Sequence, residues 1–226
     1  MCGIIGYVGD RQAQDVVVDG LARLEYRGYD SAGIALVDGG LTIEKRAGKL
    51  ANLRSALAEQ PPPAATVGIG HTRWATHGAP TDRNAHPHTD CHHRIAVVHN
   101  GIIENFAALR AELENGGHKL DSDTDTEVVA HLLEEAVDEA GSLAEAMRRV
   151  CRRLEGAFTL VALHVYEPGV VVGARRNSPL VVGRGTGENF LGSDVAAFIA
   201  YTREAIELGQ DQVVELTRDS ITVTDF

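Results

Sequence analysis

The chain opens with the stretch MCGIIGYVG, residues 1–9, in which Cys2 precedes a short apolar run. The run Gly3–Val8 predicts a β-strand. Chain ends are often poorly ordered, so a thiol at position 2 is badly placed unless a sheet holds the strand behind it. We therefore expect Cys2 either to be incidental or to make the end of the chain part of the chemistry.

Short apolar and alternating runs predict further strands along the chain. They lie at residues 32–37, 41–46, 66–70, 94–99, 159–166, 170–175, 179–183, 213–217 and 221–224. Helical spacing of apolar residues predicts helices over 13–24, 106–113, 128–137 and 143–154. Two strand-rich parts flank a helix-rich middle, which favours one α+β domain of sheets covered by helices.

Composition limits the possible partners and the compartment. The 226 residues carry a formal net charge of −11, which disfavours nucleic acid or an anionic membrane as the main partner. The sequence shows no secretory signal and no apolar run of membrane-spanning length. Three cysteines without framework spacing argue against a disulfide scaffold. We expect a cytoplasmic protein with reduced thiols.

Cys2 gains a chemical role if Met1 is removed, as is common before a small residue. The first residue would then carry both a thiol and an α-amine, whose ordinary pKa is about 7.7–8.0. A partly neutral amine can take the proton of the thiol directly or through a water, without a histidine partner. A cysteine at position 2 usually does nothing, however, so this interpretation needs other residues to support it.

Three further segments supply candidate site residues. Residues 72–78, TRWATHG, have polar donors and an aromatic but no apolar period, which is typical of a loop over a pocket. His99-Asn100-Gly101 pairs a side-chain amide with a glycine N–H, two neutral donors that can stabilise an oxyanion. The alternative is a plain turn, and we expect a strand-to-helix turn at this point.

The start of the 128–137 helix contains the third segment. Thr124 with Glu127 three residues later is typical of a capping box, which would place Asp125 in the first turn. An acidic residue there usually complements the helix dipole. The functional alternative is that Asp125 faces an ammonium group in a pocket.

One segment has the residue types of a metal site. Zinc ligands occur close together at His86, His88, Cys91, His92 and His93. Their spacing matches no common zinc pattern, so we favour polar packing and expect no metal. The Gly183-Arg184-Gly185-Thr186-Gly187 loop is a poor match to a phosphate loop because no lysine follows it.

Taken in order, these segments resemble the class II glutamine amidotransferases, which are N-terminal nucleophile hydrolases. The matching motifs are Cys2-Gly3-Ile4-Ile5-Gly6, Arg27-Gly28-Tyr29-Asp30-Ser31-Ala32-Gly33, His71 through Gly78, Asn84-Ala85-His86-Pro87, His99-Asn100-Gly101 and Thr124-Asp125-Thr126-Glu127. Each motif is weak alone, and the ordered set is specific. The resemblance implies a four-layer αββα sandwich, two antiparallel sheets face to face with helices outside.

The resemblance also implies roles for individual residues, with L-glutamine as the substrate. It makes Cys2 the nucleophile and its α-amine the base, with Asn100 and Gly101 forming the oxyanion hole. It further assigns the glutamine α-carboxylate to Arg73, the α-ammonium to Asp125, and a closing loop to Trp74, Thr76 and His77. Arg27 would support the surroundings of the nucleophile. No cofactor and no metal are implied.

Within the family, residues 26–31, YRGYDS, resemble the branch that passes ammonia to fructose 6-phosphate. The amidophosphoribosyltransferases, which usually carry His-Arg-Gly-Gln there, are the alternative. The resemblance implies that residues 1–226 are one glutaminase domain, whose partners in the whole enzyme are C-terminal sugar-isomerase domains absent from this sequence. It implies a homodimer for that whole enzyme.

Two hypotheses of other classes remain open from the residues alone. One is a thiol hydrolase that pairs Cys91 or Cys2 with a histidine. The other is a non-catalytic metal-binding module built on the His86–His93 segment.

Overall fold

The computed structural model describes residues 2–74 and 78–226, and within these residues the strands form two antiparallel sheets. The seven-stranded sheet has the order β11 (Glu204–Glu207), β9 (Val181–Arg184), β10 (Asn189–Gly192), β1 (Gly3–Val8), β4 (Val67–Arg73), β2 (Ser31–Val37) and β3 (Leu41–Ala47). The six-stranded sheet has the order β13 (Ile221–Asp225), β12 (Gln212–Leu216), β8 (Val171–Arg176), β7 (Gly156–His164), β6 (Ile95–Ile103) and β5 (His88–Thr89).

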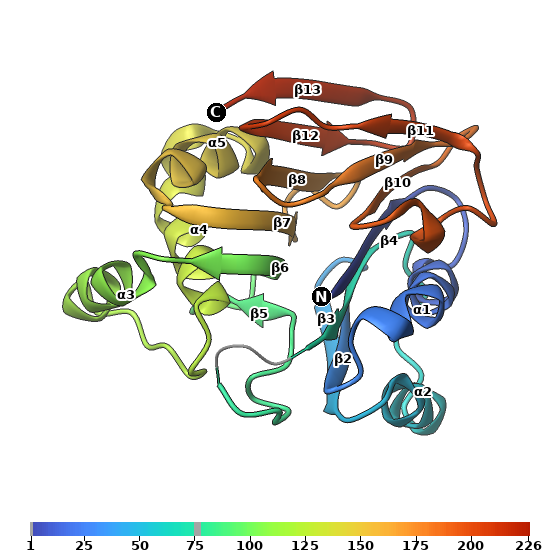
Figure 1. Cartoon of the computed structure of the whole chain (residues 1–226), viewed down its shortest axis with the longest axis horizontal. Helices are drawn as coiled ribbons and strands as arrows, with labels where there is room; N and C mark the ends of the chain where they lie inside the picture. The colour runs from blue at the N-terminus through green and yellow to red at the C-terminus, as the bar shows by residue number, and fades with distance from the viewer. Residues whose placement is uncertain (1, 75–77) are drawn as a thin grey trace.

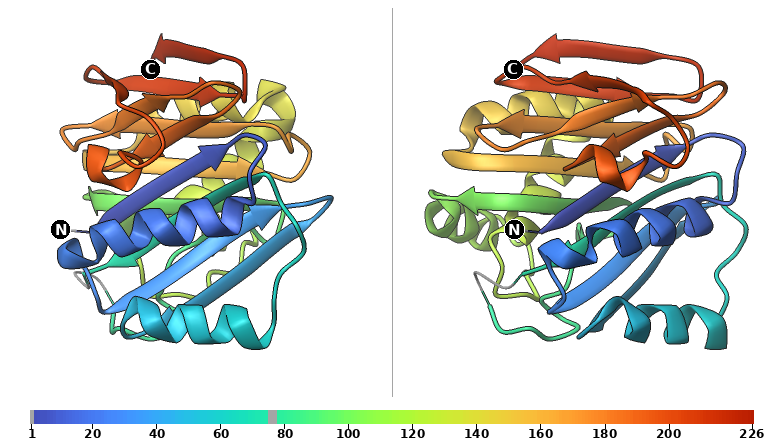
Figure 2. Two further views of the ribbon diagram at one scale, coloured as in Figure 1. Left: turned by 90° about the vertical axis from the view of Figure 1, so that its right-hand side faces the viewer. Right: turned by 45° about the vertical axis from the view of Figure 1, so that its right-hand side comes forward.

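Helices cover the outer face of each sheet (Figures 1 and 2). The seven-stranded sheet is covered by α1 (Ala13–Leu24) and α2 (Leu50–Glu59). The six-stranded sheet is covered by α4 (Thr126–Ala140) and α5 (Leu143–Arg153), with α3 (Phe106–Asn115) packed beside α4. Short 3₁₀ helices lie at Glu25–Arg27 and Val195–Ala197. The result is the four-layer αββα sandwich that the family resemblance implied.

Strand β1 shows why the opening sequence folds in this way. Side chains alternate across a strand, so Ile4 and Val8 pack into the core between the two sheets. Ile5 and Tyr7 face the opposite way and pack with helix α1. Because β1 pairs with β10 on one side and β4 on the other, it is an inner strand of its sheet. The strand that follows Cys2 is therefore hydrogen-bonded along both of its edges.

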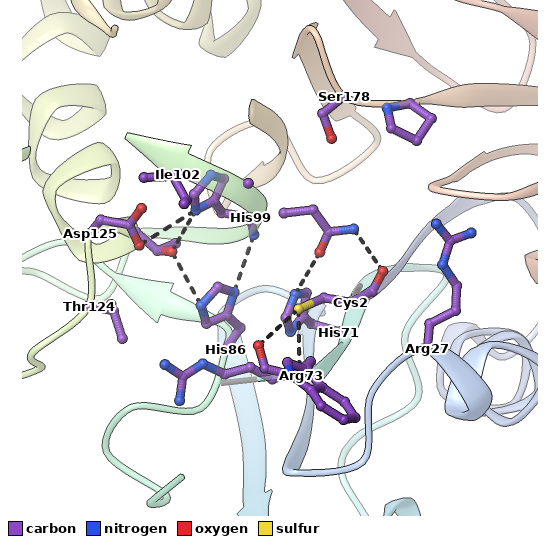
Figure 3. A pocket seen from close by; sticks show the side chains of 15 residues that line it. Cys2, Arg27, His71, Arg73, His86, His99, Ile102, Thr124, Asp125 and Ser178 are labelled. Atoms are coloured by element: carbon purple, nitrogen blue, oxygen red, sulfur yellow. Dashed lines mark hydrogen bonds and ion pairs between the residues drawn. The ribbon is translucent and has the colours of Figure 1, made fainter. Parts of the chain in front are cut away.

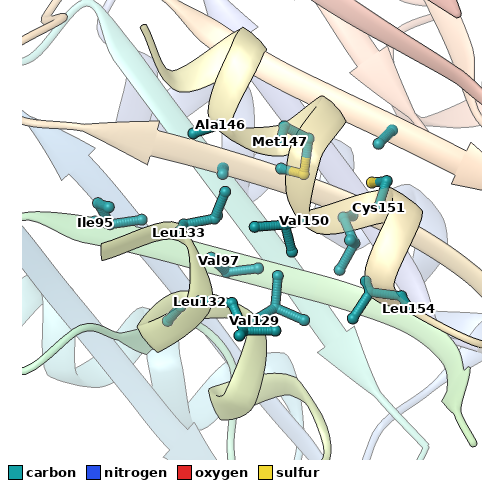
Figure 4. Close-up of a cluster of buried hydrophobic side chains, with 14 of the residues drawn as sticks. Ile95, Val97, Val129, Leu132, Leu133, Ala146, Met147, Val150, Cys151 and Leu154 are labelled. Carbon is teal, nitrogen blue, oxygen red and sulfur yellow. The ribbon is translucent and has the colours of Figure 1, made fainter. Parts of the chain in front are cut away.

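A third core lies between the six-stranded sheet and helices α4 and α5 (Figure 4). Ile95 and Val97 of β6 meet Val129 and Leu133 of α4, and Val150 of α5 packs in the same cluster. This packing fixes α4 against β6, and the first residues of α4 and the last residues of β6 are those that enter the site.

Most of the predicted elements are confirmed, with shifts of a few residues at their ends. The strands predicted from residues 3, 32, 41, 66, 94, 159, 170, 179, 213 and 221 and the four predicted helices are all present. The sequence prediction missed β5, β10, β11 and α2. Helix α2 had a signal, since Leu50, Leu53 and Leu57 share one buried face.

Two local predictions are wrong. Strand β6 runs through Asn100 and Gly101 to Ile103, pairing with β7 throughout, so no strand-to-helix turn forms at Asn100. The capping box does not form either, because the N-cap residue is Asp125. The carboxylate of Glu127 instead accepts the N–H groups of Asp121 and Ser122, at 2.8 and 2.6 Å, and so stabilises the loop before the helix.

Candidate active site

A cavity of about 330 Å³ opens where strand ends of the two sheets meet the start of α4 (Figure 3). It collects every predicted site residue that the structure describes, namely Cys2, Arg27, Arg73, Trp74, Asn100, Gly101 and Asp125. Thr76 and His77, predicted for the closing loop, and Met1 lie outside the described residues. Segments far apart in the sequence therefore supply one site.

Cys2 lies at the start of β1 and is held by the main chain of Trp74. Its Sγ accepts the Trp74 N–H at 3.1 Å and donates to the Trp74 carbonyl at 3.5 Å. Burial raises the pKa of the Cys2 thiol, and the Trp74 N–H partly opposes that rise. Among the residues that the structure describes, no histidine nitrogen hydrogen-bonds to this sulfur.

Asn100 lies on β6 with its amide directed at Cys2. Its Nδ2 donates to the Cys2 carbonyl at 3.0 Å, which leaves Oδ1 as an acceptor for His71 Nε2 at 3.0 Å. Burial lowers the pKa of His71 to about 3, so the ring is neutral near pH 7. The tautomer with the proton on Nε2 fits this geometry, because an amide oxygen can only accept.

His71 is thus a positioning residue that sequence reasoning did not assign to the site. Its place in the strand before the TRWATHG loop was visible in the sequence. What the sequence did not show is the antiparallel register that sets β4 beside β1 and across from β6. The ring fixes which end of the Asn100 amide faces the cavity.

Gly101 follows Asn100 in a backbone conformation that favours glycine. Its φ is +120°, and a Cβ there would collide with the Ala157 carbonyl of the neighbouring strand β7. The residue therefore has to be glycine if β6 and β7 are to stay paired at this point. Its exposure leaves the main chain beside Asn100 open to the cavity.

Two buried groups of opposite charge lie in the cavity. Arg73, at the end of β4, donates from Nη2 to the Gly78 carbonyl at 3.2 Å. Asp125, at the N-cap of α4, accepts the Ile103 N–H on Oδ2 at 2.9 Å. Arg73 is 4% exposed and Asp125 5%, so both charges are largely removed from bulk water. Such a pair can bind a small zwitterion at its two ends.

Three polar side chains under Asp125 hold the wall of the cavity. Thr126 Oγ1 lies 2.9 Å from His99 Nδ1 and 3.2 Å from His86 Nε2, and His86 Nδ1 accepts the His99 N–H at 3.3 Å. Burial lowers the pKa of His86, which keeps it neutral. The prediction of polar packing for this part of the His86–His93 segment is therefore confirmed. These groups also line the cavity and were not predicted as site residues.

Arg27 approaches the cavity from the side opposite Asp125 (Figure 3). Its Nη1 donates to Asp194 at 2.9 Å, and Asp194 also caps the 3₁₀ helix at Val195–Ala197. The Trp74 ring meets Tyr29 edge-on with centroids 5.3 Å apart. Arg27 thus ties the 3₁₀ helix at Val195–Ala197 to the side of the cavity, and Tyr29 packs against the Trp74 ring.

The fold and this constellation define a class of protein. Residues 71–200 match the glutamine amidotransferase domain family, which covers more than half of the chain. The chain belongs to this family. Its fold is that of the N-terminal nucleophile hydrolases, as the sequence motifs implied.

Individual relatives narrow the comparison. The chain is 72% identical to the isomerizing glutamine–fructose-6-phosphate aminotransferase of Streptomyces coelicolor and 60% identical to the enzyme of that name from Mycolicibacterium smegmatis. Each match covers all of this chain but only 37% and 38% of those proteins. The chain therefore spans little more than a third of the length of these relatives.

Solved structures agree on the fold. Glutamine phosphoribosylpyrophosphate amidotransferase from B. subtilis superposes with a TM-score of 0.84 at 25% identity, covering 99% of this chain and 49% of that one. The backbone is thus shared with an enzyme named for phosphoribosylpyrophosphate, whereas the two relatives above are named for fructose 6-phosphate. Within the part of the chain that the structure describes, no helix is long and apolar enough to cross a membrane.

Proposed function

We propose that the chain hydrolyses L-glutamine to glutamate and ammonia through a γ-glutamyl thioester on Cys2. The observation that carries the proposal is the convergence of Cys2, Asn100, Arg73 and Asp125 on one cavity. These groups supply a nucleophile, an oxyanion donor and the two charges that an amino-acid head group needs.

The nucleophile acts through the end of the chain in this proposal. Once Met1 is removed, the α-amine of Cys2 takes the thiol proton while Sγ attacks the side-chain carbonyl carbon of glutamine. The resulting ammonium returns the proton to the leaving nitrogen, and the C–N bond breaks to release ammonia. A water then attacks the thioester, the amine again acting as base, and glutamate leaves. The lack of a histidine contact to Cys2 Sγ among the described residues supports an amine base.

Oxyanion stabilisation falls to Asn100 and Gly101. Asn100 Nδ2 already lies 3.0 Å from a Cys2 oxygen, so it points to the atoms around the nucleophile. The Gly101 N–H would be the second donor. Both are neutral and preorganised, so they stabilise charge that develops in the tetrahedral intermediate with little rearrangement.

Substrate recognition falls to the charged pair. Arg73 binds the α-carboxylate and Asp125 the α-ammonium, which positions the amide end of glutamine at Cys2. Trp74, with Thr76 and His77, belongs to the loop that closes over the substrate. Arg27 acts through its ion pair with Asp194 as a positioning residue.

The ammonia acceptor is fructose 6-phosphate in this proposal, bound by sugar-isomerase domains beyond the present sequence. Identities of 72% and 60% to the aminotransferases, against 25% to the phosphoribosyl enzyme, support this acceptor over phosphoribosylpyrophosphate. We further propose that residues 1–226 form a single glutaminase domain, that the whole enzyme is a homodimer, and that it works in the cytoplasm without a catalytic cofactor.

A matched pair of proteins tests the mechanism. One sample begins at Cys2, verified by intact mass, and the other keeps a short uncleavable extension before it. We expect glutaminase activity only from the first, and a diazoketone analogue of glutamine should add once, on Cys2, with glutamine protecting. Equal activity of the extended protein would overturn the amine base, and an adduct on another residue would overturn the nucleophile.

A further inference from the structure

Four potential metal ligands converge on the far side of α4 from the core. They come from the turn between β5 and β6, the segment after α3, and two successive positions on one face of α4: Cys91, His118, His131 and Glu134. We propose that this set, called the four-ligand cluster below, binds one zinc ion. None of its members lines the cavity at Cys2, so the site is separate from the proposed catalytic one.

The distances between the ligand atoms match the edges of a zinc tetrahedron. Bonds of about 2.0–2.3 Å around a tetrahedral zinc place neighbouring ligand atoms about 3.3–3.6 Å apart. Cys91 Sγ lies 3.4 Å from Nδ1 of both His118 and His131. Those two nitrogens are 3.2 Å apart, and they lie 3.2 and 3.5 Å from Oε2 of Glu134. All four atoms fall within 4.8 Å of one another.

The outer ring nitrogens of both histidines face carboxylates. His118 Nε2 lies 3.3 Å from Glu135, and His131 Nε2 lies 3.8 Å from Glu127. Metal-bound histidines commonly direct their second N–H at such a group. Protons on Nε2 leave the Nδ1 lone pairs of the two rings pointing at each other across 3.2 Å, an arrangement that a cation between them would satisfy.

Glu134 is oriented for the same centre. Its Oε2 accepts the Cys91 N–H at 3.2 Å, and its Oε1 faces His92 and Arg94 at 3.4 and 4.0 Å. Because His92 and Arg94 hold Oε1, the other oxygen, Oε2, is directed toward the cluster. Glu134 and His131 are three residues apart on α4, which places both on one face of the helix.

The chemistry of the set favours zinc over hard cations. A thiolate and two imidazoles suit zinc, whereas calcium and magnesium prefer oxygen ligands. Thiolate and carboxylate together neutralise the charge of Zn²⁺, which lowers the cost of placing the ion beside the buried His131 and Glu134. Four protein ligands close the coordination sphere, so the ion has a structural role.

The ion would connect three segments that enter the fold separately. It ties the β5–β6 turn and the segment after α3 to helix α4. Asp125 is the N-cap residue of α4 and lines the cavity. The position of α4 therefore also sets one wall of the cavity. The residue types of the His86–His93 segment suit zinc, although their spacing favoured polar packing, and the four-ligand cluster takes only Cys91 from that segment.

The test measures zinc in tag-free protein by elemental mass spectrometry, after saturation with zinc and exhaustive dialysis. We expect about one zinc per chain, and a cobalt-substituted sample with the charge-transfer band of a cobalt–thiolate bond. Cys91→Ala and His118→Gln, whose sites are exposed or half-buried, should each reduce the bound zinc to less than about 0.1 per chain. Chelation of the wild-type protein should lower its Tm by several degrees.

Two control variants separate this cluster from other zinc-binding groups. Cys2→Ala removes the N-terminal thiol, which could chelate zinc together with the α-amine, and it should keep the zinc. His92→Gln removes an exposed neighbouring imidazole and should also keep it. Wild-type protein without zinc, or zinc retained in Cys91→Ala and lost in Cys2→Ala, would overturn the proposal.

Discussion

The thiols of Cys2 and Cys91 lie in opposite kinds of surroundings, whereas Cys151 is buried in the apolar core. Cys2 Sγ hydrogen-bonds to the main chain of Trp74, and His71, which lines the same cavity, is directed at Asn100. Cys91 Sγ contacts two imidazole nitrogens at 3.4 Å. A search for cysteine beside histidine would therefore select Cys91, in the cluster we propose to hold a metal, and pass over the cysteine in the cavity.

The comparison teaches that the surroundings, and not the presence of histidine, separate the two roles. A closed set of four ligands leaves no position for a substrate. A thiol at the chain end with oxyanion donors beside it needs only a base, and the α-amine can supply that base. This contrast disfavours the thiol hydrolase with a Cys–His pair, because the residues around Cys91 lie outside the cavity.

Replacing Cys2 and Cys91 with alanine, one at a time, is the strongest test of the different roles we assign to them. Cys2→Ala should lower glutaminase turnover by at least about 10⁴-fold because the covalent route is lost. Cys91→Ala should keep turnover within about twofold at 25 °C, since it contacts neither the cavity nor Cys2. A coupled assay for glutamate measures both. The reverse pattern, with Cys91 essential and Cys2 dispensable, would assign the chemistry to a Cys–His pair.

Within the cavity, kinetic constants should separate the oxyanion donor from the head-group site. Asn100→Ala should lower kcat by about 10²–10³-fold with a modest change in KM, because its donor acts in the transition state. Asp125→Asn keeps an acceptor for the Ile103 N–H but loses the charge, so KM for glutamine should rise about tenfold to a hundredfold.

The pattern of constants decides the assignment. If Asn100→Ala changed KM alone, or Asp125→Asn changed kcat alone, the two roles would have to be exchanged or abandoned. Far-UV circular dichroism of both variants serves as the control for folding.

Acid should weaken the fold through buried histidines at the cavity, His71 and His86, and through His88 beside them. The pKa of His71 falls from its ordinary value of 6.5 to about 3, and burial also lowers the pKa of His86 and His88. The unfolded chain then binds more protons than the folded one, so stability is lost as the pH falls from about 6.5 toward 3. His71 contributes about 1.4 kcal/mol per pH unit within that window, and His86 and His88 act in the same direction.

Urea unfolding at pH 7, 6 and 5 measures this loss. His71→Gln should make the dependence on pH shallower, because one buried imidazole is gone. A free energy of unfolding that stays constant over this range would contradict neutral burial. Glu127, with a pKa lowered to about 2, acts in the same direction but only below its ordinary value of 4.5.

The spacing of apolar residues predicted those helices and strands that are determined by residues close together in the sequence. Helix α1 and strand β1 have the predicted bounds because each has a regular apolar face. The order of motifs, through a family resemblance, predicted Cys2, Arg73, Asn100 and Asp125, all of which line the cavity.

Other features depend on pairing between distant residues and left no local signal. Strands β10 and β11 are four residues each, and β10 follows the glycine-rich segment 185–187, so no period was visible. The turn expected at Asn100-Gly101 is overridden by pairing with β7, in which Asn100 lies opposite Thr159. His118 and His131 meet Cys91 only because α4 packs against β5 and α3 packs against α4, contacts that no spacing rule predicts.

The inner position of β1 also determines when during synthesis the cavity can form. One neighbour of β1 is β10, whose residues leave the ribosome nearly a whole chain length later, and Ile4 hydrogen-bonds to Ser193 just beyond it. The proposed mechanism requires Met1 to be removed, and the sheet that holds Cys2 closes only after β10 has been made. The proposal therefore implies an order in time, in which the end of the chain is processed first and the finished sheet then holds Cys2 in place.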